Sequence, residues 1–206
     1  TRFEKNGNSL VLISVDNELK ALIGIRDQIR PGVKEDLQKL KKLGVKNLVV
    51  LSGDNQGTVD LVARELGLTE AHGHMLPGDK STYIEKLKAK GHIVAFVGDG
   101  VNDSPSLALA QIGIAMGSGT DVAIETSDVV LMNSDFSRLP HALGLTKATA
   151  NNMRQNIIIA VGVVLILLAS VFFSEWMNMS IGMLVHEASI LFVILNGMRL
   201  LRYKLR

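Results

Sequence analysis

The sequence predicts an α/β protein built on a parallel sheet and followed by a two-helix transmembrane hairpin. Short apolar strands alternate with polar loops and amphipathic helices in the first two thirds of the chain, which is typical of a parallel sheet. Residues 157–173 contain no charged side chain, and residues 179–195 form a second apolar run that only His186 and Glu187 interrupt. Each run is about long enough, at ~1.5 Å per residue and with a few flanking residues, to cross a hydrocarbon layer of ~30 Å.

The charges that flank these runs predict the orientation of the hairpin. Basic residues precede the first run and follow the second: Lys147, Arg154, Arg199, Arg202, Lys204 and Arg206. Because basic residues concentrate on the cytoplasmic side, we expect a multi-pass protein of the cell membrane with both ends of this chain in the cytoplasm. The alternative is a buried helical hairpin inside a soluble protein, although two such runs side by side are rare in soluble cores.

Composition excludes some functions and suggests a fragment. The chain has no cysteine, so it can form neither a disulfide framework nor a thiolate metal site. A net charge of +2 gives no reason to expect a nucleic-acid partner. The first residue is Thr1 and the text begins as if inside a domain, so we expect the amino-terminal part of the same polypeptide to be missing.

The predicted elements follow in order. Residues 9–15 and 19–25 should form a β-hairpin, because a short polar turn separates two apolar runs. A helix should begin near Pro31 and end at Gly44, since leucines recur at helical spacing between them. Residues 47–51 should be a buried strand, followed by a polar loop and a helix that ends at Leu66.

The strand, loop and helix pattern then repeats. Residues 92–97 should form a second buried strand, followed by a Gly-rich polar loop and a helix over residues 106–110. Ligands of such sheets bind at the loops that follow the carboxyl ends of the strands. His72 and His74 belong to no motif, and we interpret their segment as a solvated loop.

Two polar loops are suited to a phosphoryl group. Ser52 and Gly53 lie between a strand and a helix, where a hydroxyl and backbone amides could cradle phosphate, although Asp54 and its neighbours are also ordinary helix caps. Lys80 lies at the start of a helix, where a positive charge is mildly unfavourable unless an anion is close. A surface lysine is the equally simple alternative.

The loop over residues 98–103 is the most specific. Asp99 and Asp103 are two carboxylates four residues apart on a Gly-rich turn, and oxygen ligands of this kind suit Mg²⁺. Asn102 can donate its amide to a phosphate oxygen. Two unpartnered carboxylates would repel each other, so a divalent cation explains the loop better than a simple turn does.

Together these motifs resemble those of the P-type ATPases. The resemblance rests on SGDN, LPGDK and VGDGVNDSPSL in the family's order, followed by a long helix and two apolar spans. It implies a phosphorylation domain of the haloacid-dehalogenase-like superfamily that uses ATP and Mg²⁺.

The resemblance assigns a role to each motif residue. Ser52 and Gly53 would bind phosphoryl oxygens, Asp54 would lie beside the nucleotide and Mg²⁺, and Lys80 would neutralise an aspartyl phosphate. Asp99 would ligate Mg²⁺, Asn102 would contact the phosphate and Asp103 would complete the site. Asp27 and Arg30 would form the hinge to the nucleotide-binding domain.

The same resemblance divides the chain into four parts. Residues 1–25 would end the nucleotide-binding domain, 26–140 would be the second part of the phosphorylation domain, 141–156 a connecting helix, and 157–206 the two membrane helices with a cytoplasmic tail. The family's nucleophilic Asp lies in a D-K-T-G-T motif that this sequence lacks. The haloacid-dehalogenase-like sheet should therefore be incomplete, with a gap between the strand ending at Leu51 and the one ending at Val97.

His186 and Glu187 point to a transported metal. Ionisable groups near the middle of a membrane span are costly and usually functional, and the alternative is a structural hydrogen bond to a neighbouring helix. An imidazole and a carboxylate suit a divalent metal such as Zn²⁺, Co²⁺, Cd²⁺ or Fe²⁺ better than Cu⁺. Two spans after the phosphorylation domain resemble the heavy-metal subgroup, although Ala188 replaces its usual Gly.

We therefore expect the carboxyl-terminal part of an ATP-driven heavy-metal exporter that forms an aspartyl phosphate. On its own this chain should be inactive, because the nucleophile is missing. A copper exporter is the second hypothesis, and a truncated, inactive membrane-bound interaction partner is the third. A phosphatase of the same superfamily ranks low, because Asp16 and Asp27 lack the motif of a nucleophile.

Overall fold

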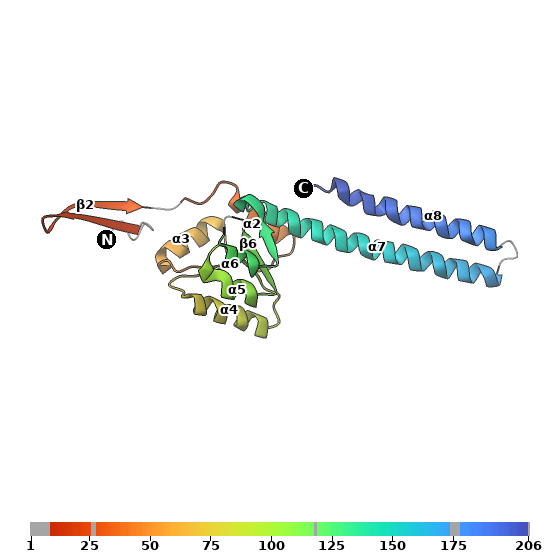
Figure 1. Ribbon diagram of the computed structural model, residues 1–206, viewed down its shortest axis with the longest axis horizontal. Coiled ribbons are helices and arrows are strands. Elements are labelled where there is room, and N and C mark those ends of the chain that lie inside the picture. The colour runs from red at the N-terminus through yellow and green to blue at the C-terminus, as the bar shows by residue number, and fades with distance from the viewer. Residues whose placement is uncertain (1–8, 26–27, 118, 174–177, 206) are drawn as a thin grey trace. The chain divides into compact units, whose positions relative to one another are not determined.

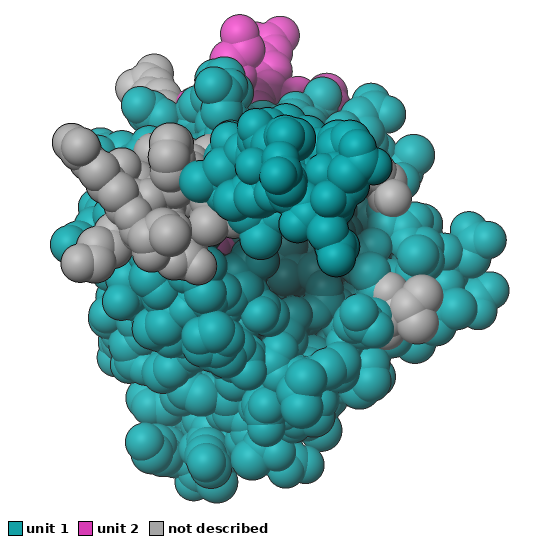
Figure 2. All heavy atoms as spheres, turned by 90° about the vertical axis from the view of Figure 1, so that its left-hand side faces the viewer, with its two compact units in different colours: residues 1–139 teal, residues 140–206 magenta. Residues whose placement is uncertain are grey.

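The computed structural model describes residues 9–25, 28–117, 119–173 and 178–205. The chain divides into two compact units, Thr1–Leu139 and Pro140–Arg206, which are coloured teal and magenta in Figure 2. Unit 1 holds the strands and short helices, and nearly all of unit 2 is two long helices (Figure 1).

The first element of unit 1 is the predicted hairpin. Strands β1 (Ser9–Val15) and β2 (Glu18–Ile25) pair antiparallel, which confirms the prediction. Asp16 and Asn17 both have positive φ, at 52° and 62°. Two such residues in succession form the turn whose twist matches that of the flanking strands, and Asn and Asp tolerate this conformation best.

The remaining strands of unit 1 form two separate parallel sheets. Strand β3 (Val49–Leu51) pairs with β4 (Glu70–His72). Strand β5 (Ala95–Gly98) pairs with β6 (Ile112–Met116), which pairs with β7 (Val129–Leu131). Within the described residues β3 and β5 share no ladder, so the predicted gap in the sheet is confirmed.

The helices of unit 1 alternate with these strands, as the sequence pattern predicted. They are α2 (Val33–Lys42), α3 (Gln56–Leu66), α4 (Pro77–Ala89), α5 (Ser104–Leu109) and α6 (Asp121–Glu125), together with the 3₁₀ turns η1 (Val101–Asp103) and η2 (Met132–Ser134). The predicted limits are close, but β5 begins at Ala95 rather than His92, and α5 begins at Ser104 rather than Ser106.

Buried side chains hold these elements together. Ile84 of α4 and Leu107 of α5 are each about 1% exposed, and Ala115 of β6 and Ala123 of α6 are fully buried. Gly113 allows α5 to lie close to β6, because a Cβ there would lie 2.5 Å from the backbone oxygen of Leu107. This packing fixes α5, and with it the loop that precedes α5, against the sheet.

Unit 2 consists almost entirely of the two predicted apolar helices. Helix α7 (Arg138–Phe173) has 36 residues, so the expected connecting helix and the first span are one continuous rod about 54 Å long. Helix α8 (Met179–Met198) is followed by the 3₁₀ turn η3 (Arg199–Arg202). Both helices are long and apolar enough to cross a membrane, and none of their most apolar window is buried in the structure.

Candidate active site

The most specific loop follows strand β5 and leads into α5. Gly98 ends β5 and is buried, and a Cβ on it would lie 2.7 Å from the Cβ of Asp103. The chain therefore needs glycine here to turn back on itself and bring Asp103 against the strand end. The amide of Asp103 donates to the carbonyl oxygen of Gly100 (3.0 Å), which closes the turn.

Lys80 and Asp103 form the central ion pair of this loop. The Nζ atom of Lys80 lies 2.8 Å from Oδ1 of Asp103, and the two side chains are only 15% and 14% exposed. Lys80 is in the first turn of α4, where the helix dipole makes a positive charge unfavourable unless an anion is close. The carboxylate of Asp103 is that anion. Removing one partner of such a covered pair would leave the other charge uncompensated.

Asp99 and Asn102 are also on this loop, but no ion pair holds their side chains in place among the described residues. Both are exposed, and among the described residues neither side chain has a hydrogen-bond partner. The backbone oxygen of Asp99 accepts from Thr120 (3.2 Å), which anchors the loop while leaving the carboxylate free.

This donor set fits one side of a magnesium site. Asp99 and Asp103 offer carboxylate oxygens, the ligands that Mg²⁺ prefers, and one or two carboxylates are its usual protein share. In the part of the chain that the structure describes, no three His, Cys, Asp or Glu side chains converge on a point that could hold a metal. The remaining ligands would have to be water, phosphate oxygens or another segment.

The Ser52 loop forms a compact turn at the end of β3. The Ser52 hydroxyl donates to Oδ2 of Asp54 (2.8 Å) and accepts from the amide of Asp54 (3.2 Å). Asn55 caps α3, because its side-chain oxygen accepts from the amide of Thr58 (2.9 Å). Gly53 and Asp54 therefore do not serve as the cap, and both are exposed. Between this loop and residues 98–103 the described residues form no hydrogen bond.

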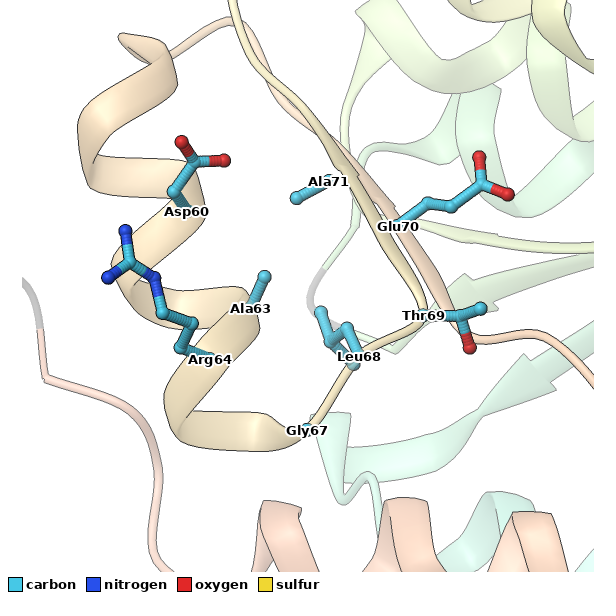
Figure 3. Close-up of a pocket in the computed structure, with 8 residues that line it drawn as sticks. All are labelled: Asp60, Ala63, Arg64, Gly67, Leu68, Thr69, Glu70 and Ala71. Carbon is cyan, nitrogen blue, oxygen red and sulfur yellow. The ribbon is translucent and has the colours of Figure 1, made fainter.

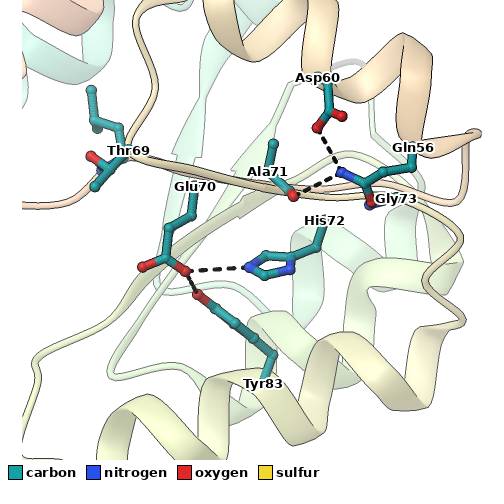
Figure 4. Close-up of polar contacts among 9 residues, drawn as sticks. Gln56, Asp60, Thr69, Glu70, Ala71, His72, Gly73 and Tyr83 are labelled. Atoms are coloured by element: carbon teal, nitrogen blue, oxygen red, sulfur yellow. Dashed lines mark hydrogen bonds and ion pairs between the residues drawn. The ribbon is translucent and has the colours of Figure 1, made fainter.

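Gly73 and His74 support this loop, and the sequence reasoning missed both. A Cβ on Gly73 would lie 2.8 Å from the backbone oxygen of Asp54, and the amide of His74 donates to that oxygen (2.7 Å). Gln56 holds the same segment, because its Oε1 accepts from the amide of Gly73 (2.7 Å). Its Nε2 donates to Oδ1 of Asp60 (2.7 Å) and to the backbone oxygen of Ala71 (3.0 Å) (Figure 4). The glycine between two histidines was the available signal, since glycine permits close backbone approach.

The interpretation as a solvated loop is wrong for His72 but holds for His74, which is exposed and lies outside any strand or helix. His72 belongs to β4, and its ring centroid lies 4.8 Å from that of Tyr83. The Tyr83 hydroxyl donates to Oε2 of Glu70 (2.6 Å), and Nε2 of His72 lies 3.3 Å from the same oxygen (Figure 4). The hydrogen bond from Tyr83 lowers the pKa of Glu70, whereas burial and the Glu70 carboxylate raise the pKa of Tyr83 to about 12.

These two shifts predict a pH-dependent effect of Tyr83→Phe. A lowered pKa in the folded state stabilises the protein above the ordinary pKa of Glu70, near 4.5, and this contribution is lost as the pH falls through the lowered value. The raised pKa of Tyr83 stabilises the fold below pH 10 and is lost as the pH rises toward about 12.

We therefore expect Tyr83→Phe to lower the free energy of unfolding at pH 7 by about 0.5 kcal/mol, since the carboxylate is half exposed. Urea unfolding at pH 7 and below pH 4 measures this, and the loss should shrink at the lower pH. In a Glu70→Gln background the cost should not change with acid pH. An equal pH dependence in both backgrounds would contradict this account.

A pocket of about 350 Å³ lies apart from these loops, between α3 and β4 (Figure 3). Its lining consists of Asp60, Ala63, Arg64, Gly67, Leu68, Thr69, Glu70 and Ala71. None of the site residues that the sequence predicted contributes to it.

The remaining predicted site residues are on α8 of unit 2 and in the segment between β2 and α2. His186 and Glu187 are exposed on α8, and the backbone oxygen of His186 accepts from the Ser189 hydroxyl (2.7 Å). Arg30 is exposed just before α2, and Asp27 lies outside the described residues. The structure brings together Lys80, Asp99, Asn102 and Asp103. His186 and Glu187 belong to the other unit, and Arg30 lies on a different segment of unit 1.

Comparison with known proteins shows the family of the chain. A family model described as haloacid dehalogenase-like hydrolase matches residues 2–111, and a second model with that description matches residues 80–143. A probable cadmium-transporting ATPase of Staphylococcus aureus (strain MRSA252) is 40% identical over 202 residues, which cover 98% of this chain and 28% of that protein. A probable copper-transporting ATPase of Synechocystis sp. is 44% identical over 159 residues, which cover 77% of this chain and 21% of that protein.

A solved structure extends the match to both units. The crystal structure of a zinc-transporting PIB-type ATPase in the E2.Pi state matches with a TM-score of 0.84 and 36% identity, covering 98% of this chain and 33% of that one. The chain thus spans about a fifth to a third of the length of these proteins. It belongs to the haloacid dehalogenase-like hydrolases and, within them, to the group of P-type ATPases related to heavy-metal transporters.

Proposed function

We propose that this chain is the carboxyl-terminal part of an ATP-driven heavy-metal exporter that forms an aspartyl phosphate. The observation that carries the proposal is the covered Lys80–Asp103 pair beside the free carboxylate of Asp99, on the loop that follows the unpaired edge of β5. A strand supplied by the segment before Thr1 would fill the gap between β3 and β5 and bring the nucleophilic Asp to this loop. On its own the chain would then be inactive.

The predicted site residues would each have a separate role in phosphoryl transfer. Asp99 and Asp103 would hold Mg²⁺, which when bound neutralises charge on the phosphoryl oxygens. Lys80, held by Asp103, keeps its ammonium group at the loop, where it opposes the negative charge of a phosphorylated Asp. Asn102 and, once released from Asp54, the hydroxyl of Ser52 would donate hydrogen bonds to phosphoryl oxygens, and Asp54 would lie beside the nucleotide.

Helices α7 and α8 would cross the cell membrane with both ends of the chain in the cytoplasm. Their apolar side chains are exposed along most of their length, which favours a lipid environment over a soluble core. Arg199, Arg202 and Lys204 follow α8, as the positive-inside rule requires. His186 and Glu187 would ligate the transported metal together with groups from other helices. Residues 1–25 would close the nucleotide-binding domain, with the hinge at Asp27 and Arg30.

A divalent cation is the proposed cargo. A carboxylate and an imidazole favour Zn²⁺, Cd²⁺ or Co²⁺ over Cu⁺, which prefers sulfur. The similarity to the cadmium transporter also extends over more of the chain than the similarity to the copper transporter, 98% against 77%.

The test is ATP hydrolysis by the whole polypeptide, purified in detergent and titrated with Zn²⁺, Cd²⁺, Co²⁺ and Cu⁺. We expect hydrolysis that depends on Mg²⁺ and is stimulated by the divalent metals, while the 206-residue chain alone hydrolyses no ATP. Stimulation by Cu⁺ alone would favour the copper hypothesis. Hydrolysis that no metal stimulates would overturn the proposal.

A further inference from the structure

A cluster of side-chain amides joins α7 and α8 at one end of the hairpin. We call Asn152, Gln155 and Asn156 of α7 and Asn196 of α8 the amide cluster. The Nδ2 atom of Asn152 donates to the backbone oxygen of Asn196 (2.8 Å), and Nδ2 of Asn196 donates to Oδ1 of Asn156 (2.8 Å). Asn156 donates in turn to Oδ1 of Asn152 (3.1 Å), so the bonds close into a ring. Asn152 is only 4% exposed.

The chain after α8 keeps the same register against α7. The ring of Tyr203 lies 5.6 Å from that of His141, and a Cβ on Gly144 would lie 2.3 Å from the Tyr203 hydroxyl oxygen. Position 144 precedes 152 by eight residues, and 203 follows 196 by seven, so both contacts belong to one antiparallel alignment. Glycine at 144 is what allows Tyr203 to lie against α7.

These contacts can determine how α8 sits on α7. Lipid offers apolar helices no hydrophobic gain from association, so hydrogen bonds and close packing decide their register. Sliding α8 by one turn would break the ring and leave the buried amide of Asn152 without its partner, and a buried polar group without a hydrogen bond costs free energy. The other side chains of both helices are mostly exposed and apolar and provide no comparable constraint.

The amide cluster also sets the direction of Glu187. The half-covered residues of α8 form one stripe: Gly182, Ser189, Val193, Asn196 and Gly197. Glu187 precedes Asn196 by nine residues, which at about 100° per residue is two and a half turns. Since Asn196 faces α7, Glu187 lies on the opposite side of α8 and faces away from α7.

We propose that Asn152, Asn156 and Asn196 are positioning residues that fix the depth and rotation of α8, so that Glu187 faces the helices that complete the metal path. This inference rests on the proposed function, because it assigns the transported metal to α8. The ring of hydrogen bonds would also make α7 and α8 move as one body. Because α7 is covalently continuous with unit 1, a movement of unit 1 that displaces α7 would displace α8 as well.

The test uses the whole polypeptide with Asn156→Leu, Asn196→Leu and the double variant. Leucine is close to asparagine in size and apolar, so these changes do not hinder insertion into lipid. The matched control is Asn151→Leu, since Asn151 is an exposed neighbour on α7. We measure the metal concentration for half-maximal ATP hydrolysis and the KM for ATP, with Glu187→Gln as the reference variant.

We expect each single variant to raise the half-maximal metal concentration about tenfold. The KM for ATP should not change, the double variant should be no worse than either single one, and Asn151→Leu should behave as the unaltered protein. Equal shifts in both constants, additive effects in the double variant, or a shift in the control would overturn the positioning role. If Glu187→Gln abolishes stimulation while the leucine variants behave normally, only this inference fails; if Glu187→Gln is normal, the metal path in the proposed function fails.

Discussion

Asp99→Asn is expected to abolish metal-stimulated ATP hydrolysis by the whole polypeptide, by a factor of about 10² or more, while leaving the fold as stable as before. The Asp99 carboxylate is exposed and, among the described residues, has no hydrogen-bond partner, so the fold gains nothing from its charge. Its proposed role is to ligate Mg²⁺. Hydrolysis rates and urea unfolding curves of the same preparations measure the two effects.

Asp103→Asn provides the matched comparison, because the same chemical change falls on a carboxylate that also holds Lys80. We expect both a similar loss of hydrolysis and a loss of about 1–2 kcal/mol in the free energy of unfolding, since the covered ammonium of Lys80 loses its partner. The control is Asp121→Asn, an exposed aspartate at the start of α6. A destabilised Asp99→Asn, or an active one, would contradict the division of roles between the two carboxylates.

The sequence predicted the order of elements well because local rules govern it. Apolar runs bounded by polar turns predicted β1, β2, β3, β5 and the helices α2, α3 and α5, and an absent motif predicted the gap between β3 and β5. The short elements β4, β6, β7 and α6 were not predicted. Strand limits were less accurate at β5, where Ile93 and Val94 extend the apolar run but lie outside the ladder that Ala95–Gly98 forms with β6.

Contacts between distant positions could not be predicted in the same way. Lys80 and Asp103 are separated by 23 residues, and only the packing of α4 on α5 brings them together. The role of His72 depends on Tyr83 and Glu70, which lie on a helix and a strand that hydropathy alone does not place side by side. The amide cluster was missed for a related reason, since asparagines on a long helix carry no signal until the partner helix is known.

Glu187→Gln is expected to raise the half-maximal metal concentration for ATP hydrolysis more than tenfold, or to abolish stimulation. A carboxylate near the middle of a bilayer costs ~2.5 kcal/mol or more unless a cation or donor compensates it. Helix α7 cannot compensate it, because Glu187 lies on the side of α8 opposite Asn196. The neutral glutamine removes this cost, so the variant should be at least as stable as the unaltered protein while it loses the metal.

His186→Ala should give a smaller shift in the same direction, since an imidazole contributes one ligand and no negative charge. Ser189→Ala is the control on the same helix, because among the described residues its hydroxyl bonds only to the backbone oxygen of His186. Titration of ATP hydrolysis with Zn²⁺ and Cd²⁺ for the three variants measures the series. We expect the half-maximal metal concentration to be highest for Glu187→Gln, lower for His186→Ala and lowest for Ser189→Ala. Glu187→Gln and Ser189→Ala change the same helix, but only Glu187→Gln removes a charge. A Ser189→Ala variant as defective as Glu187→Gln would therefore show that helix geometry, and not the carboxylate, controls metal binding.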